Sequence, residues 1–408
     1  MRDFTGRDIQ NDIPSSGEDL CSVQNQKKMK KLATILIYLT SAIALLAQEN
    51  QDKVIQRIDR LLEKELKKEN VHNVFLSLYS PTDDFEWHMA KGTFKDGREV
   101  SIQNPFYTAS IGKTFTATAI GILVDQGKIS FEDPIAKYLT TELMEGLHIM
   151  DGVDYGNSIK VSHLLQHTSG IPDYLEEPID GSPSMLDLIL TEPNRFWEPE
   201  ALISFSKDHF KPTFAPGTDY YYTDTEYVLL GLIIEKIGAM KLHEFFLKHI
   251  FTPLQMDHTY LNLRSKPIQP TAQMAEMYAG THEISTIKSL SADWAGGAIV
   301  STGKDLIRFQ KALREGDLLS AETFKEMQKW VKETKGMSYG YGLRKISFKQ
   351  LFPIFPNWEV IGHSGMNGTS MYYCPDLNMY LVGTLNQLEA SKEAVMLMVK
   401  VLMECKKR

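Results

Sequence analysis

Ser110 and Lys113 form the pattern in this sequence that most clearly predicts chemistry. Residues three apart on a helix lie on one face, so the lysine amine can sit beside the serine hydroxyl on adjacent turns. The serine would then be a nucleophile and the lysine part of its base machinery. If Ser110 opens a helix, the helix dipole also favours the negative charge that develops on its oxygen. The spacing therefore indicates acyl transfer through a serine ester.

The Ser-x-x-Lys spacing is a weak signal by itself, because it recurs at Ser204, Ser285 and Ser301. For any of these alone, an ordinary surface serine is the better interpretation. Ser110 differs because it opens an amphipathic pattern directly after the apolar and aromatic residues 105–107. Two polar motifs also follow it at long range. They are Tyr222-x-Asp224 and His363-Ser364-Gly365.

The elements that must position these motifs can be predicted from hydrophobic periodicity. Helical spacing is found in three segments, which are residues 54–66, a segment from Ser110 to a stop at Gly127, and residues 225–237. Short apolar runs predict strands at residues 74–79, 85–90, 339–343, 371–374 and 379–385, and a closing helix follows at residues 395–405. We therefore predict one sheet built from both ends of the chain, with a helical region at roughly 129–319 inserted between them.

The N-terminal part carries an export pattern. Lysines among residues 27–31 precede the apolar run 32–47, which small residues close. This predicts a secretory signal at residues 29–47 and a periplasmic or secreted protein. The run is shorter than the roughly 20 residues of a spanning helix, and an uncleaved anchor is the alternative. Residues 1–28 precede the signal, so they are a candidate non-native extension with Met29 as the candidate start.

Composition narrows the class of protein. With 43% hydrophobic and 24% charged residues, the 408-residue chain is an ordinary globular one, long enough for one large domain or two compact ones. The net charge is −8 and the sequence has no basic block, so nothing in its charge pattern indicates nucleic-acid binding. No cysteine or histidine cluster has metal-ligand spacing, so we predict no metal and no organic cofactor. Whether Cys374 and Cys405 pair stays open, as does the oligomeric state.

The motifs together identify a resemblance to a known family. The chain resembles the serine β-lactamase and penicillin-binding-protein-like family, specifically its class C branch, over roughly residues 61–402. That branch has Ser-x-x-Lys, then Tyr-x-Asn, then Lys/His-Thr/Ser-Gly. Supporting segments are residues 164–172, 214–218, 253–256 and 296–305. The resemblance implies an α+β fold, in which an antiparallel sheet flanked by helices carries an inserted helical domain, over a catalytic domain at 51–406.

The resemblance also assigns roles to residues of the site. Ser110 is the nucleophile, and Tyr222 shares the base role with Lys113 and protonates the leaving group. Ser364 and Gly365 belong to the third motif, where Ser364 helps to relay the proton. The backbone N–H groups of Ser110 and Met366 form the oxyanion hole. Because a lysine accepts a proton only when it is neutral, we expect burial or positive neighbours to lower the pKa of Lys113 from about 10.4.

Two substrate-side positions depart from the β-lactamase pattern. Asp224 replaces asparagine, and it is either the N-cap of the following helix or a carboxylate that faces Lys113 or the substrate. Beside Lys113 it would favour the charged ammonium and disfavour β-lactam hydrolysis. His363 replaces lysine, as in carboxypeptidases, aminopeptidases and esterases of the family, and is interpreted as a substrate contact that titrates near neutral pH. His167, in a tight turn, is interpreted as shaping its loop.

These residues predict a serine hydrolase for a small ester, an amide or a D-residue peptide. A D-alanyl-D-alanine carboxypeptidase and a class C-like β-lactamase are alternatives within the enzyme class, because the fold hosts all of these activities. A catalytically inactive protein that binds penicillin or peptidoglycan peptides is the alternative of another class. An interaction module with an inherited cleft is a further one. The predicted partner is a small molecule or peptide, without nucleic acid and without a membrane beyond the signal segment.

Overall fold

A computed structural model describes residues 18–82 and 85–407. The chain divides into two compact units, Asp59–Lys406 and a smaller one of residues 1–58 with 407–408. Helix α1 spans Glu18–Glu65 and contains the predicted signal at 29–47, most of whose side chains lie outside the described residues. Residues 1–17 of the candidate extension lie outside them altogether. Among the described residues, no helix is both long enough and apolar enough to cross a bilayer.

The larger unit contains one eight-stranded antiparallel sheet from both ends of the chain, which confirms the predicted α+β class. The strand order is β10-β11-β12-β13-β14-β15-β1-β2. The strands are β1 (Asn73–Ser80), β2 (Phe85–Gly92), β10 (Val331–Thr334), β11 (Met337–Tyr339), β12 (Arg344–Ser347), β13 (Glu359–Ser364), β14 (Ser370–Cys374) and β15 (Met379–Thr384). Next to the edge strand β2, Phe75 of β1 lies opposite Ala90 of β2 and Thr384 of β15.

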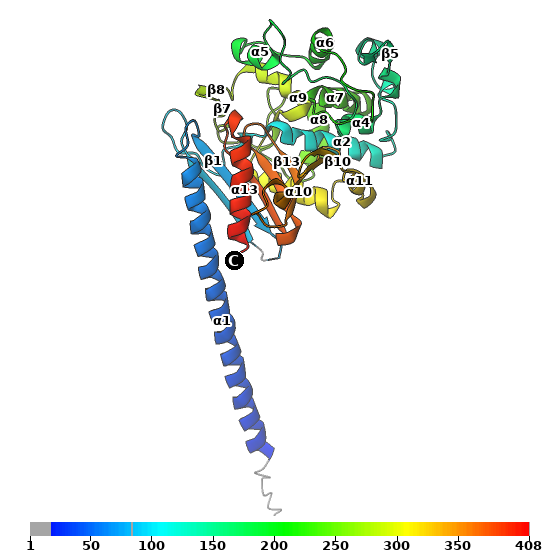
Figure 1. The fold of residues 1–408 in the computed structure, drawn as a ribbon. Coiled ribbons are helices and arrows are strands. Elements are labelled where there is room, and N and C mark those ends of the chain that lie inside the picture. Colours follow the sequence, from blue (N-terminus) through cyan, green and yellow to red (C-terminus); the bar gives the residue numbers. More distant parts are fainter. Residues whose placement is uncertain (1–17, 83–84, 408) are drawn as a thin grey trace, which may run out of the picture. The chain divides into compact units, whose positions relative to one another are not determined.

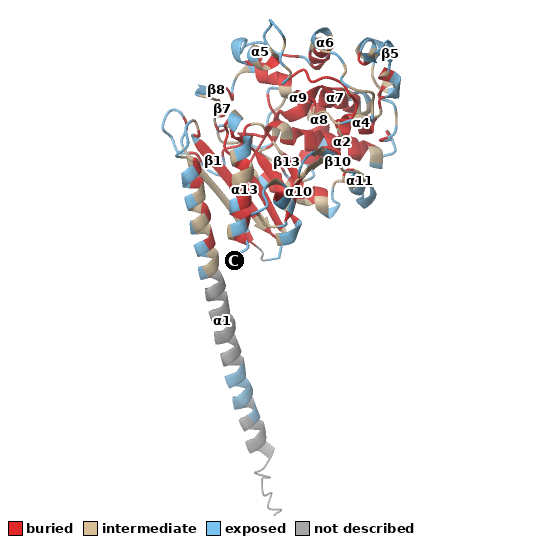
Figure 2. Ribbon diagram, viewed as in Figure 1, coloured by how far each residue is buried: buried red, intermediate tan, exposed pale blue. Residues whose placement is uncertain are grey.

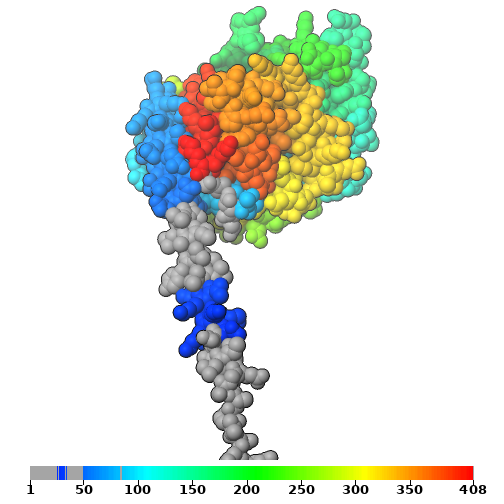
Figure 3. Space-filling model, turned by 60° about the horizontal axis from the view of Figure 1, so that its bottom comes forward, coloured from blue at the N-terminus to red at the C-terminus, as the bar shows by residue number. Residues whose placement is uncertain are grey.

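Two helices cover the two faces of this sheet (Figure 1). Helix α13 (Ser391–Cys405) lies on one face, beside the N-terminal strands with which it shares the surface in Figure 3. Helix α10 (Gly303–Glu315) lies on the other face and contributes Leu306, Phe309 and Leu313, which are buried at helical spacing. Because α10 belongs to the predicted insertion at 129–319, that region also supplies a layer of the sheet domain.

The other helices and short strands form the helical region, whose buried residues cluster in α2, α7 and α9 (Figure 2). The helices are α2 (Gly112–Asp125), α3 (Thr141–Met144), α4 (Val161–Leu165), α5 (Met185–Thr191), α6 (Pro199–His209), α7 (Asp224–Gly238), α8 (Leu242–Phe246), α9 (Trp294–Gly297), α11 (Ala321–Glu326) and α12 (Phe348–Leu351). The short strands are β3 (Phe106–Tyr107), β4 (Ile149–Met150), β5 (Val153–Asp154), β6 (Tyr260–Leu261), β7 (Tyr278–Ala279), β8 (His282–Glu283) and β9 (Ile299–Ser301). Single helical turns are η1 (Ala109–Ile111), η2 (Ile135–Lys137), η3 (Gly156–Ser158), η4 (Leu247–Phe251), η5 (Lys288–Asp293), η6 (Pro375–Leu377) and η7 (Leu388–Ala390).

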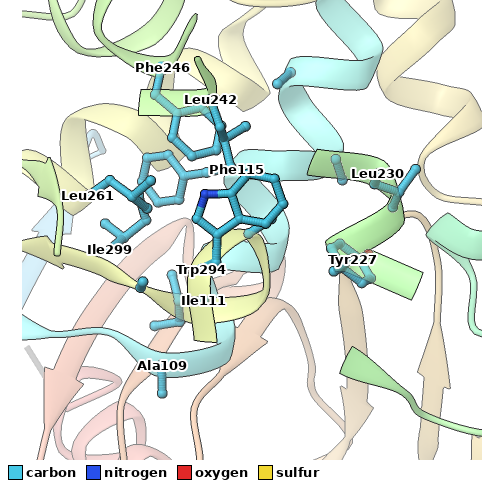
Figure 4. Packing of buried hydrophobic residues seen from close by; sticks show 14 of the residues in the cluster. Ala109, Ile111, Phe115, Tyr227, Leu230, Leu242, Phe246, Leu261, Trp294 and Ile299 are labelled. Atoms are coloured by element: carbon cyan, nitrogen blue, oxygen red, sulfur yellow. The ribbon is translucent and has the colours of Figure 1, made fainter. Parts of the chain in front are cut away.

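A continuous apolar core joins the helical region to the sheet layer. Phe115 of α2 stacks on Phe309 of α10 with ring centroids 3.8 Å apart, and Phe246 meets it edge-on. Gly231 of α7 leaves room for the Trp294 ring, since a Cβ there would lie 2.7 Å from it. Figure 4 shows Phe115, Phe246 and Trp294 among the side chains of this core. The core fixes α2, α7 and α9 against one another, and all three carry site residues.

The helices and most of the strands predicted from periodicity are present in this fold. The strand predicted at 339–343 is wrong, because β11 ends at Tyr339 and β12 begins at Arg344. Gly340 and Gly342 lie between them, and Gly342 has a φ of +62°, a left-handed conformation that a turn uses and a strand does not. Cys374 and Cys405 are both buried and no disulfide joins them, which answers the question of their pairing.

Candidate active site

Ser110 lies at a strained turn between strand β3 and helix α2. It is the central residue of η1, which leads directly into α2. The preceding residue, Ala109, has a φ of +46°, a left-handed conformation that side chains disfavour and that clusters at functional sites. Gly112 allows the turn to approach α9, because a Cβ there would lie 2.7 Å from the Cα of Gly297. The half-buried Ser110 is therefore held at the start of a buried helix.

Lys113 is completely buried one helical turn after Ser110. Its Nζ lies 3.4 Å from Ser110 Oγ and donates to the Gly296 carbonyl at 3.2 Å. The same Nζ is in direct contact with Asp224 Oδ1. Burial lowers the pKa of Lys113, but the charge of Asp224, the neighbouring Tyr222 and Asp293 and the hydrogen bond to Asp224 together outweigh it, so the net pKa is raised above its ordinary value. The expectation of a lowered pKa was wrong, because the buried neighbour is an anion.

Asp224 occupies the first position of α7, and it is not the helix cap. The N-cap is Thr223, whose hydroxyl accepts the Thr225 N–H at 3.2 Å. The Asp224 side chain is buried and points to Lys113. Its position therefore agrees with the interpretation of Asp224 as a carboxylate that faces the lysine, and not with its interpretation as a helix cap. Its backbone N–H donates to Asp173 Oδ1 at 2.7 Å, which brings a second carboxylate behind the first.

A third carboxylate, Asp293, completes this acidic cluster around Lys113. A methyl group added at Gly296 would lie 2.6 Å from Asp224 Oδ1 and 3.4 Å from both Asp293 Oδ1 and Lys113 Nζ. Burial, followed by the charge of Asp224, raises the pKa of Asp173 to about 7, and the same two causes raise that of Asp293 to about 7. Neither residue stood out in the sequence, because no motif spacing links an isolated aspartate to a serine far away.

Tyr222 lies over the Ser110–Lys113 pair. Lys113 Nζ is 4.9 Å from the centre of the Tyr222 ring. Burial raises the pKa of Tyr222 to about 12, although the charge of Lys113 acts in the opposite direction. The ring packs on the buried His167, with centroids 4.3 Å apart, and His167 Nδ1 lies 2.6 Å from Glu226 Oε2. His167 and Glu226 therefore support Tyr222 from behind.

His363 lies behind the site and is fully buried. Its Nε2 lies 2.8 Å from the Tyr339 hydroxyl and its Nδ1 lies 2.9 Å from the Ser364 carbonyl. Burial holds the pKa of His363 well below its usual value. Both ring nitrogens are thus engaged within the protein, and the interpretation of His363 as a substrate contact stays a prediction.

Arg344 of β12 supplies the positive charge on this side of the site, and the sequence motifs gave no sign of it. Its Nη1 donates to Ser364 Oγ at 3.3 Å, and the guanidinium lies 5.5 Å from the centre of the Tyr222 ring. Glu333 accepts two bonds from it, at 2.6 and 2.8 Å. Ser364 also accepts from Tyr372, so its hydroxyl is fixed between two donors beside Tyr222.

Gly365 brings the end of strand β13 against the nucleophile turn. A Cβ at this position would lie 2.7 Å from both Ala109 Cβ and the Thr108 carbonyl oxygen. The next residue, Met366, presents a backbone N–H for which the described residues provide no acceptor. The Ser110 N–H lies in a first helical turn, where N–H groups lack intrahelical acceptors. The assignment of these two N–H groups to an oxyanion hole stays a prediction.

A largely apolar pocket of about 180 Å³ opens beside this turn. Its lining includes Ala109, which precedes Ser110, and Met366, whose backbone N–H belongs to the proposed oxyanion hole. Its remaining lining is mostly aliphatic, and is formed by Tyr107, Leu175, Leu186, Ile189, Leu190, Met277, Ala279, Ile284, Leu290, Asp293, Leu388 and Glu389. The site can therefore hold a carbonyl carbon at Ser110 with an apolar substituent beside it. In the described residues, no group of three acidic, histidine or cysteine side chains is arranged to hold a metal ion.

Similarity to known proteins agrees with this geometry. The model of the Beta-lactamase family matches residues 81–400. The chain is 27% identical over 256 residues to the putative penicillin-binding protein PbpX of Bacillus subtilis, covering 61% of this chain and 56% of that protein. It is 24% identical over 304 residues to the putative D-alanyl-D-alanine carboxypeptidase of Escherichia coli K12, covering 67% and 66%. The chain spans about half the length of the two Bacillus subtilis penicillin-binding proteins that it matches.

Solved structures share the fold over nearly their whole length. The D-stereospecific amidohydrolase from Streptomyces sp. aligns with a TM-score of 0.68 at 27% identity, covering 83% of this chain and 96% of that one. The D-amino acid amidase from Ochrobactrum anthropi SV3, complexed with D-phenylalanine, aligns with a TM-score of 0.72 at 22% identity, covering 87% and 100%. The class C branch stays a prediction. Because the family model spans well over half of the sequence, the chain belongs to the Beta-lactamase family, which confirms the resemblance predicted from its motifs.

Proposed function

We propose that the protein is a serine hydrolase that forms an acyl-enzyme at Ser110 and transfers the acyl group to water. Its substrate is a small ester, an amide or a peptide of D-residues. The observation that carries this proposal is the pairing of Ser110 Oγ with Lys113 Nζ, 3.4 Å apart at the start of a buried helix. The names of its relatives, which include a carboxypeptidase and two amide hydrolases, support an acyl-transfer reaction.

The first step needs a proton acceptor, and the Lys113–Asp224 pair provides one. As the bond from Ser110 Oγ to the substrate carbonyl carbon forms, the serine proton moves to Lys113 Nζ. Lys113 passes one of its own protons to Asp224 Oδ1, with which it is in direct contact. The pair thus takes up the serine proton and becomes positively charged, which balances the negative charge of the tetrahedral intermediate, and no proton is lost to solvent. This relay explains how a lysine with a raised pKa can accept the proton of the serine nucleophile.

The remaining steps use the groups around Ser110. The backbone N–H groups of Ser110 and Met366 stabilise the oxyanion of the tetrahedral intermediate. Tyr222, protonated at neutral pH because of its raised pKa, donates its proton to the leaving group as the carbonyl carbon releases it. The Lys113–Asp224 pair then restores the tyrosine proton. A water molecule attacks the ester by the same path in reverse, which frees the acid product and Ser110.

A non-catalytic binding protein is the second candidate. The raised pKa of Lys113 favours it, because a lysine that stays protonated is not a base by itself. Such a protein would be acylated once by a β-lactam and would turn over neither esters nor amides. The direct contact of Asp224 with Lys113 also predicts little β-lactamase activity, since this cation is then neutralised within the site.

Covalent labelling tests the nucleophile and separates these candidates. Intact-mass spectrometry after incubation with a fluorophosphonate, and separately with a penicillin, should show one adduct in the wild-type protein and none in Ser110→Ala. In parallel, the wild type should hydrolyse p-nitrophenyl acetate and show little nitrocefin turnover, while Ser110→Ala should hydrolyse neither. Labelling that persists in Ser110→Ala would reject the nucleophile. A penicillin adduct without ester turnover would favour the binding protein.

We further propose that the protein is exported. The basic residues before the apolar run 32–47 support a cleaved signal at 29–47. Expression of the full chain in a Gram-negative host should place the protein in the periplasmic fraction, with an N-terminus after residue 47 by Edman sequencing. Recovery from the cytoplasm with residues 29–47 intact would contradict export.

A further inference from the structure

The apolar pocket beside Ser110 contains two ionisable carboxylates in different settings. Glu389 is exposed, and its Oε2 accepts a hydrogen bond from the Gln387 amide at 2.9 Å. Asp293 is half-buried, and it is both the last residue of η5 and the N-cap of α9. Only Asp293 also belongs to the acidic cluster around Lys113. Of the two carboxylates, Asp293 is thus the one next to the reacting atoms.

The Asp293 carboxylate is held in place but is not neutralised. Tyr107 donates its hydroxyl to Oδ2 at 2.9 Å, whereas no described residue donates a hydrogen bond to Oδ1. The nearby cation, Lys113, is in direct contact with Asp224 instead. Gly297 gives the carboxylate its space, because a Cβ there would lie 2.3 Å from Oδ2 and 2.6 Å from Oδ1. A buried carboxylate without a counter-charge is unfavourable, so a cation from outside would be stabilised there.

The volume and the lining of the pocket indicate which other group of the substrate would bind beside such a cation. Eleven of the fourteen lining residues carry aliphatic or thioether side chains, so the walls favour an apolar group. An apolar cavity of about 150 Å³ is large enough to hold benzene, and this pocket has about 180 Å³. A branched aliphatic or an aromatic side chain therefore fits.

We propose that the acyl half of the substrate carries a free ammonium group, which binds Asp293, and an apolar side chain, which fills the pocket. An ester or amide of an apolar α-amino acid has this arrangement, with both substituents on the carbon next to the attacked carbonyl. Ala109, Met366 and Asp293 all line the pocket, so both substituents lie on the pocket side of the attacked carbonyl. This inference rests on the proposed acyl-enzyme at Ser110.

Matched thioesters test the inference with one leaving group. Thiobenzyl esters of D- and L-phenylalanine, of N-acetylphenylalanine and of 3-phenylpropionic acid differ in the acyl half only, and the released thiol is measured in each case. In the wild type, kcat/KM for the better phenylalanine enantiomer should exceed that for the desamino and N-acetyl esters by at least 10-fold. It should also exceed that for the alanine ester by at least 10-fold, because alanine leaves the pocket empty.

Asp293→Asn identifies the group that binds the ammonium. Because Asp293 also belongs to the acidic cluster around Lys113, the readout is the ratio of the two esters. This variant should lose at least 10-fold more in kcat/KM on the phenylalanine ester than on the 3-phenylpropionic ester, and urea denaturation shows separately that it is folded. Glu389→Gln removes the other carboxylate of the pocket and should preserve the preference for the amine. A preference that survives Asp293→Asn, or one that disappears in Glu389→Gln, would overturn the assignment.

The failure of this inference can be told from failure of the proposed function. If the wild type is labelled by the fluorophosphonate and hydrolyses the 3-phenylpropionic ester as well as the phenylalanine ester, the acyl-enzyme stands and the ammonium site falls. If Ser110 is not labelled and no ester is hydrolysed, the proposed function falls, and the ammonium site falls with it.

Discussion

Replacement of Lys113 by methionine should lower kcat/KM for p-nitrophenyl acetate by roughly 10²–10⁴-fold, the range that a positioned proton-transfer group contributes. Methionine keeps an unbranched chain of similar length in the buried space but has no group to receive the Ser110 proton. The Lys113 Nζ is the only described cation within hydrogen-bond reach of Ser110 Oγ. The loss should therefore lie in acylation, measured as the rate of fluorophosphonate adduct formation.

The same substitution should destabilise the protein, because it leaves Asp224 buried without its partner. Breaking a buried ion pair from one side typically costs about 3–5 kcal/mol, whereas replacing both members by apolar groups is often neutral. Urea denaturation should therefore show the full loss in Lys113→Met and a partial recovery in Lys113→Met/Asp224→Leu, which stays inactive. Lys128→Met, exposed just beyond the same helix, should change neither stability nor activity.

Several outcomes would contradict this account of Lys113. Full activity in Lys113→Met would show that another group takes the serine proton. Inactivity together with wild-type stability would show that the Lys113–Asp224 contact contributes nothing to folding. Recovery of activity in the double variant would show that the lysine is needed only to compensate the buried aspartate.

Local sequence patterns predicted the parts of the fold and of the site that depend on near neighbours. The Ser110–Lys113 spacing fixed a shared helix face, and the apolar runs near both ends gave strands β1, β2, β14 and β15. The strand prediction failed at 339–343, where apolar residues alternate with glycines that form a turn. There the backbone requirement of Gly342 outweighs the preference of the neighbouring aromatic residues for a strand.

The charges around the site could not be predicted in this way, because they come from segments far apart in sequence. Asp173 lies on a loop, Asp293 is the last residue of η5, and Arg344 is on strand β12. Only the folded chain brings these residues close to Lys113 and Tyr222. Asp224 shows the same limit. A local rule makes aspartate a good helix cap, but Thr223 takes the cap and the aspartate pairs with a lysine 111 residues away.

The acidic cluster has a consequence for the family motif. An asparagine at position 224 would remove the largest of the charges that raise the pKa of Lys113, although Asp293 would remain, and burial would then lower this pKa toward that of a usable base. With aspartate, the pair always holds a proton and transfers it internally. With asparagine the base is a neutral lysine, and with aspartate it is the lysine–aspartate pair. A single substitution at position 224 converts one arrangement into the other.

Asp224→Asn should accordingly make both activity and stability depend on pH through Lys113. In the wild type the pKa of Lys113 is raised, so the lysine stays charged across the working range. In the variant its pKa falls below that of the unfolded chain, and the unfolded state then binds more protons than the folded state. Stability must therefore rise with pH, and urea denaturation should show a larger deficit at pH 6 than at pH 9.

The ratio of variant to wild-type kcat/KM on the 3-phenylpropionic thioester should rise in the same direction, since neutral Lys113 accumulates as pH increases. At pH 6 we expect a loss on the order of 10²-fold, the lower end of what a proton-transfer group contributes. Nitrocefin turnover should increase relative to ester turnover, because the carboxylate of the β-lactam no longer meets that of Asp224. Asp219→Asn makes the same change at an exposed position of the preceding loop and should leave both pH profiles unaltered. Identical profiles for Asp224→Asn and the wild type would show that Asp224 has no part in the proton path, and would return the base role to Lys113 or Tyr222 alone.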